Sequence, residues 1–189
     1  MSTAVMTEPV APGASPMFKA RLAGLFYLLT FAFGLPAMLL ARGRTINGFI
    51  AAICYVVVTL LFYGLFKPVS KRLSMLAAFI SLLGCAAGML GSMHLMPFRI
   101  NALVFFGFYC LLIGYLIVRS TYLPRFLGVL MALAGLGWLT FFSAWLPKIL
   151  FPWNVVPGMV GEGSLTLWLL IAGVNATAFI EQARAPRTR

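Results

Sequence analysis

Long apolar runs divide the chain into six segments. Each run holds about 20 residues, the number that a helix needs to cross roughly 30 Å of hydrocarbon. The runs are apolar on all sides, whereas a strand of a membrane barrel alternates in polarity over about ten residues. Basic residues or prolines close each run. The pattern predicts six transmembrane helices, at residues 22–40, 48–66, 73–93, 100–118, 126–146 and 163–179.

Most connections between these runs are short, so consecutive helices are expected to be neighbours in one compact all-α bundle. The expected domain is residues 19–181, between a disordered cytoplasmic tail at 1–18 and a basic cytoplasmic tail at 182–189. The first run follows a polar tail and is too long for the apolar core of a signal peptide, so we expect it to be retained. The longer connection, from Pro147 to Glu162, holds Trp153 and is expected to lie at the membrane interface.

Composition agrees with a membrane protein and excludes several enzyme classes. The chain is 62% hydrophobic and 9% charged, with a mean hydropathy of +1.03, which does not suit a soluble surface. It contains three acidic residues and one histidine. That inventory scarcely supplies an aspartate pair, a two-metal centre or a zinc site, so we expect no catalytic set, no metal and no cofactor.

The basic residues indicate the orientation. With six spans, the two terminal segments and the connections after the second and fourth runs lie on the same side of the membrane. Ten basic residues lie on that side: Lys19, Arg21, Lys67, Lys71, Arg72, Arg119, Arg125, Arg184, Arg187 and Arg189. Four lie on the other side: Arg42, Arg44, Arg99 and Lys148. The bias predicts that both termini are cytoplasmic. The net charge of +11 sits at helix ends, so anionic lipid headgroups, not nucleic acid, are the expected partner.

Glu162 is the one acid away from the termini. We expect it in the first turn of the last helix near the outer surface, where its carboxylate would accept from free backbone N–H groups. It would also pair with at least one of Arg42, Arg44, His94, Arg99 or Lys148. Glu162, Arg99, His94 and Lys148 therefore form a candidate structural or ligand site, and the alternative is a proton or cation site at Glu162.

Arg119 and Arg125 bracket an inner turn. They are expected to reach lipid phosphates, and a site for an anionic headgroup or substrate is the alternative. Ser92, Ser164 and His94 raise the idea of a serine hydrolase, but the motif Gly-x-Ser-Gly is absent.

Small residues four apart predict where helices approach closely. Gly84, Gly88 and Gly91 lie in the third run, which we expect to be among the most buried, with Gly84 and Gly88 against a neighbouring backbone. Gly128 and Gly135 repeat the pattern in the fifth run.

Two stretches, GYLIVRSTYLPRFLGVL at 114–130 and PGMVGEGSLTLWLL at 157–170, resemble the bacterial membrane family called domain of unknown function 4386 (DUF4386). The opening at 21–25 and the ending at 173–175 also fit. Trp138 stands where a tyrosine is common, and Gly163 stands where a larger residue is usual. The resemblance implies a multi-span protein of the bacterial inner membrane and carries no activity.

Three functions compete. The first is a non-catalytic bundle that binds a small molecule or lipid, or serves as an accessory subunit of a homo-oligomer or larger membrane complex. The second is a small-solute or proton-coupled transporter, which would place ionisable groups at mid-membrane depth. The third is an enzyme that modifies lipids, which needs a base and an activated nucleophile or metal. The scarcity of such groups favours the first function.

Overall fold

A computed structural model describes residues 15–40, 43–93, 95 and 101–185. These residues form helices and connections and no strand. The helices are α1 (Pro16–Leu39), α2 (Arg44–Phe66), α3 (Lys71–Ser92), α4 (Ala102–Arg119), α5 (Arg125–Leu139), η1 (Thr140–Phe142), α6 (Leu146–Leu150), α7 (Val156–Ile171) and α8 (Ala176–Arg184).

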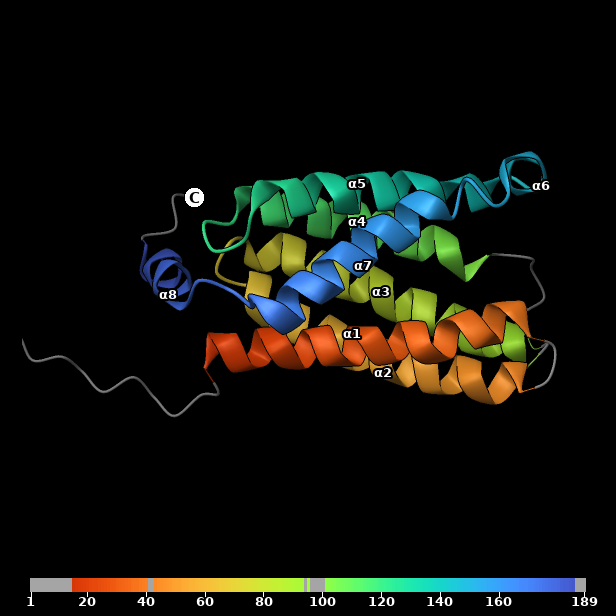
Figure 1. The fold of residues 1–189 in the computed structure, drawn as a ribbon, viewed down its shortest axis with the longest axis horizontal. Helices are drawn as coiled ribbons and strands as arrows, with labels where there is room; N and C mark the ends of the chain where they lie inside the picture. The colour runs from red at the N-terminus through yellow and green to blue at the C-terminus, as the bar shows by residue number, and fades with distance from the viewer. Residues whose placement is uncertain (1–14, 41–42, 94, 96–100, 186–189) are drawn as a thin grey trace, which may run out of the picture.

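Six long helices close into a ring. Helices α1 to α5 pack in sequence, each against its neighbour in the chain. Helix α7 packs on both α5 and α1, so the last long helix closes the ring onto the first. Figure 1 shows α7 crossing the face between α1 and α5. Helices α1 to α4, and α5 continued through η1 to Phe142, are long and apolar enough to cross a membrane. The bent pair of α7 and α8 gives a sixth candidate span if the pair is counted as one. The predicted all-α bundle is confirmed.

The last long helix differs from its predicted range of 163–179. It begins at Val156, because Pro157 occupies its first turn, where proline suits a helix. It ends at Ile171, and Gly173 follows with φ +68°, a left-handed conformation that favours glycine. Asn175 then caps α8 by accepting from Ala178 N at 3.1 Å, and α8 turns away from α7 by 102°.

Other boundaries also differ from the prediction. The fifth run continues past the end of α5 at Leu139 as a 3₁₀ turn, in which Thr140 Oγ1 donates to Gly137 O at 2.7 Å. Ser15 caps α1, so Pro16 to Phe18 are helical and not part of a disordered tail. Helix α8 extends to Arg184, so the predicted tail at 182–189 begins inside a helix.

The expectation for α3 is wrong. Of its span 33% is buried, against 44% of α2 and 39% of α4 and α5. A Cβ added at Gly84 would meet Phe105 Cβ at 3.0 Å, and one at Gly88 would meet Ala102 Cβ at 3.6 Å, so both glycines face side chains and not backbone. Alanine and phenylalanine on α4 keep the two helix axes further apart than paired glycines would.

A close backbone contact joins α4 to α5. A Cβ on Gly114 would lie 2.7 Å from Gly128 O, and one on Gly128 would lie 2.6 Å from Gly114 O. Gly107 and Gly135 repeat this arrangement two turns away. The paired glycines let the two backbones touch, which is the main attraction available between helices when lipid is as apolar as leucine.

The two halves of the ring are filled differently. Toward the end that carries α8, large side chains are nearly fully buried and fill the interior: Phe62, Leu65, Phe66, Leu116, Ile117 and Leu127. Toward the end that carries α6, the interior holds a cavity.

Candidate functional site

Glu162 lies inside the bundle and not at its surface. It is the seventh residue of α7, and its side chain is 5% exposed. The prediction of a first-turn position is therefore wrong, because α7 begins seven residues before the predicted start. Glu162 lies beyond the first turn of α7, so its carboxylate does not accept from the free backbone N–H groups at the start of the helix.

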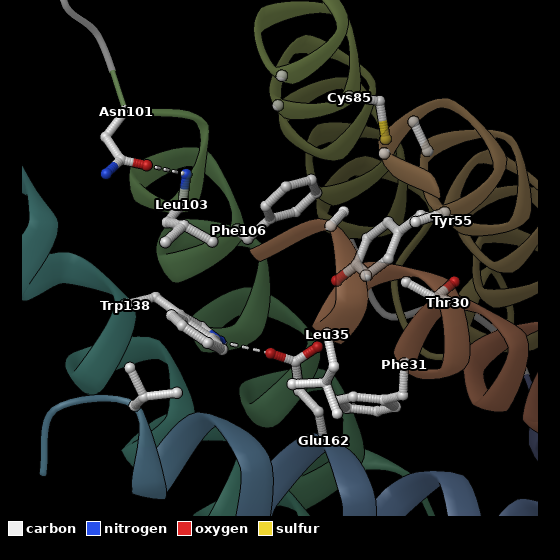
Figure 2. Close-up of a pocket in the computed structure, with 18 of the residues that line it drawn as sticks. Thr30, Phe31, Leu35, Tyr55, Cys85, Asn101, Leu103, Phe106, Trp138 and Glu162 are labelled. Carbon is white, nitrogen blue, oxygen red and sulfur yellow. Dashed lines mark hydrogen bonds between the residues drawn. The ribbon is translucent and has the colours of Figure 1, made fainter. Parts of the chain in front are cut away.

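Two neutral side chains hold the Glu162 carboxyl. Tyr27 of α1 donates its hydroxyl to Oε2 at 2.6 Å, and Trp138 of α5 donates its indole Nε1–H to Oε1. Figure 2 shows the indole directed at the carboxyl. All three residues are buried. The carboxyl on α7 thus joins the two helices, α1 and α5, that flank α7 in the closed ring.

Glycines in α7 make this approach possible. A Cβ on Gly158 would meet the Trp138 indole ring, and one on Gly161 would meet Leu130 O of α5. On the α1 side, a Cβ on Gly24 would lie 3.0 Å from Leu170 N. Because these positions lack side chains, α7 lies close enough to α5 and α1 for Glu162 to reach both donors. The segment PGMVGEG at 157–163 therefore supplies both the carboxyl and the glycines that let it reach its donors.

The predicted cations do not join Glu162 in the described chain. Arg44 is exposed and donates Nε–H to Ala37 O at 3.2 Å. Lys148 is exposed on α6. Arg42, His94 and Arg99 lie outside the described residues. Basic side chains stay at the ends of the helices, whereas the carboxyl lies deeper than predicted, so its described partners are neutral.

A cavity of about 460 Å³ adjoins Glu162. It extends between α1, α2, α3, α4, α5 and α7, as far as Ser92 at the end of α3 and Asn101 at the cap of α4. Most of its lining is apolar, and Gly34, Gly48 and Gly88 widen it. A Cβ at any of these three glycines would make ordinary contacts of 3.6 Å or more. The absence of side chains at these three positions therefore leaves space in the cavity wall.

Aromatic rings form much of the wall, as Figure 2 shows. The rings that line the cavity belong to Phe31, Tyr55, Phe106, Trp138 and Phe141. Tyr55 packs against Phe106 with ring centroids 4.7 Å apart, and edge-on against Tyr27 at 5.6 Å. These contacts fix the ring of Tyr55 beside Tyr27, whose hydroxyl donates to the Glu162 carboxyl.

Tyr55 has a polar group that is not satisfied. Its side chain is 6% exposed, and its hydroxyl has no hydrogen-bond partner among the described residues. Figure 2 shows the hydroxyl directed to the side of the cavity where Glu162 lies. By contrast, Thr30 Oγ1 and Ser92 Oγ donate to Phe26 O and Gly88 O. A buried hydroxyl without a partner is uncommon and calls for an explanation.

The other candidate residues lie elsewhere. Arg119 and Arg125 are exposed at the ends of α4 and α5, at the end of the bundle that carries α8. The Arg119 guanidinium lies 6.0 Å from the centre of the Tyr115 ring. Cys54, Cys85 and Cys110 are buried free thiols. Within the described ranges, no three His, Cys, Asp or Glu side chains gather as metal ligands would.

Sequence reasoning singled out Glu162 but missed Tyr27, Tyr55 and Trp138. One feature of the sequence pointed to Trp138, because it stands where a tyrosine is common in the family that the chain resembles. Both residue types carry a hydrogen-bond donor at the end of an apolar ring. Tyr27 is 135 residues from Glu162 in the chain, and nothing local marks it.

Comparison with known proteins identifies the family but no activity. The model of the family described as "Domain of unknown function (DUF4386)" matches residues 46–101 and 98–173. An uncharacterized protein of the archaeon Archaeoglobus fulgidus is 31% identical over 138 residues, which cover 66% of this chain and 80% of the relative. No solved structure matches. The chain belongs to the DUF4386 family of proteins of unknown function.

Proposed function

We propose that this protein binds a small, mostly apolar molecule in the cavity beside Glu162. The observation that carries the proposal is a buried carboxyl, held by two neutral donors, at the wall of an apolar cavity of about 460 Å³. Ligand sites in proteins have roughly this volume, with apolar walls and a few polar groups that orient the ligand.

The hydroxyl groups of the cavity support binding over catalysis. Group transfer needs a nucleophile activated by a nearby base. Ser92 and Thr30 instead donate to backbone carbonyls of their own helices, at 2.8 and 3.0 Å. Both oxygens of Glu162 accept hydrogen bonds from ring donors, which suits an anchor more than a base for either hydroxyl.

Transport is the second candidate, and the depth of Glu162 favours it. An acid in the interior of an apolar helix is where ion and substrate pathways place their ionisable groups. However, the cavity occupies one half of the ring, and large buried side chains fill the other half. A path through the bundle would require those side chains to move, so binding is the function that needs no second conformation.

We further propose that the protein lies in the cytoplasmic membrane with both termini in the cytoplasm. Eight described basic residues lie at the end of the bundle that carries α8, and Arg44 and Lys148 lie at the other end. Arg119 and Arg125 would then contact anionic headgroups of the inner leaflet. A homo-oligomer or a larger membrane complex is compatible with the apolar exterior.

A cavity-filling variant tests the binding function. N,N-dimethylbenzylammonium and isobutylbenzene have the same shape and differ in charge, and either should raise the unfolding temperature of the detergent-solubilised protein saturably. Gly88→Leu places a bulky side chain in the cavity and should abolish this shift. Gly64→Leu on α2 is the control, since Gly64 does not line the cavity and a Cβ there meets nothing within 4 Å. Equal shifts in the two variants, or no shift in the parent, would reject the proposal.

A further inference from the structure

We infer that the ligand of this cavity is an organic ammonium ion with an apolar body, held by Glu162, the aromatic wall and the Tyr55 hydroxyl. The inference rests on the proposed binding function and names the chemical class of the ligand. Three features of the cavity carry it: an acid without a cation, a wall of rings, and a hydroxyl without a partner.

The first feature is charge. Glu162 is the one acidic residue in the interior of the described chain, since Glu181 is exposed on α8. Each of its carboxyl oxygens accepts one described hydrogen bond and has a second lone pair to offer. An ionised carboxylate is costly in apolar surroundings unless an opposite charge accompanies it. A cationic ligand supplies that charge, whereas an anionic ligand would add to the cost.

The second feature is the aromatic wall. Five rings line a cavity that contains a single charged residue. The face of an aromatic ring is the negative part of its quadrupole, so rings attract ammonium groups, and the attraction is larger where water is excluded. A neutral apolar ligand would pack as well against aliphatic side chains, so the rings beside Glu162 favour a cation.

The third feature is the Tyr55 hydroxyl. The oxygen is buried and lacks a partner among the residues described, and Tyr55 is one of the residues that line the cavity. A protonated tertiary amine has one N–H group, which can donate to this oxygen while its charge interacts with Glu162. A quaternary ammonium has the same charge but no N–H donor. The orphaned hydroxyl therefore favours a protonated amine over a fully methylated one.

Three probes of similar shape separate these contributions. N,N-dimethylbenzylammonium has charge and one N–H, benzyltrimethylammonium has charge alone, and isobutylbenzene has neither. We expect the full chain in neutral detergent to bind them in that order of affinity, as measured by the ligand-induced shift in unfolding temperature. Glu162→Gln should weaken both cations at least tenfold and leave isobutylbenzene unchanged. Glu181→Gln, on the exposed face of α8, should change none of the three.

A second pair of variants keeps the test decisive if Glu162→Gln does not fold. Tyr55→Phe removes a hydroxyl that has no described partner, so the fold should persist, while the preference for the N–H probe over benzyltrimethylammonium is lost. Tyr109→Phe is matched, because the Tyr109 hydroxyl is also buried and unpartnered in the described chain but does not line the cavity. It should keep the preference.

The outcomes distinguish the two proposals. If isobutylbenzene binds as tightly as both cations, and Gly88→Leu abolishes its binding, the ammonium inference is wrong and the binding function stands. If Tyr55→Phe and Tyr109→Phe behave alike, the assigned role of Tyr55 is wrong and the inference fails with it. If no probe gives a shift that Gly88→Leu removes, both proposals are rejected.

Discussion

Among single residues, Trp138 has two roles, because its ring lines the cavity and its N–H holds Glu162. Trp138→Phe keeps most of the ring but leaves one carboxyl oxygen without its donor. An unsatisfied buried acceptor costs about 1–3 kcal/mol, so the free energy of unfolding should fall by roughly that amount. Trp153→Phe is the control, because Trp153 is 75% exposed, and it should have little effect.

A double-mutant cycle separates the hydrogen bond from the lost ring volume. If the bond stabilises the fold, Trp138→Phe should cost less in a Glu162→Leu background, which removes the acceptor, than in the parent, because residues in one network are not additive. Additive effects in reversible unfolding in mixed micelles would show that Trp138 acts through packing alone.

The position of Glu162 shows what local sequence reasoning could and could not find. Its importance was predictable, since one acid in a long apolar stretch is unusual. Its depth does not follow from a helix at 163–179, whereas Pro157 as a helix-start signal and Gly173 as a helix-end signal give the observed range. The contact with Tyr27 could not be predicted, because it depends on α7 closing the ring onto α1.

At the level of helices, the glycine patterns of α3 and α5 look alike in sequence but differ in the fold. The spacing in α5 marks a true backbone contact, because α4 offers Gly107 and Gly114 at the matching positions. The spacing in α3 meets phenylalanine and alanine and partly lines the cavity. A small-residue stripe predicts a close contact only when the neighbour is small at the same level, which one helix alone does not reveal.

The backbone contact at Gly128 of α5 predicts that a glycine-to-alanine substitution acts in opposite ways there and at Gly64 of α2, where no neighbour is close. Gly128→Ala places a methyl group against Gly114 O, so overpacking should cost about 1–3 kcal/mol of unfolding free energy. Gly64→Ala meets nothing within 4 Å and should be neutral or stabilise by up to about 1 kcal/mol, because alanine favours a helix more than glycine does. Equal effects of the two variants on the unfolding midpoint would contradict the assigned contact.

For the molecule as a whole, ring closure determines where the chain ends. Six long helices that alternate in direction bring the end of α7 back to the start of α1, and Figure 1 shows α8 at that end of the bundle. Tyr122 of the α4–α5 turn fixes α8 there, because its ring packs edge-on against Phe179 with centroids 5.2 Å apart. Gln182 of α8 accepts from Thr121 N at 3.0 Å. These contacts hold the amphipathic α8 at this end of the bundle, across the direction of α7.

Labelling of introduced cysteines tests this arrangement and its orientation in the membrane. The three native cysteines are buried, so the parent should not react with a membrane-impermeant maleimide. In intact cells Lys148→Cys on α6 should react and Thr177→Cys on α8 should not, whereas both should react after permeabilisation. These outcomes follow from the proposed orientation, in which the basic end of the bundle faces the cytoplasm. Labelling of Thr177→Cys alone in intact cells would reverse the orientation, and labelling of both would mean that α7 does not cross.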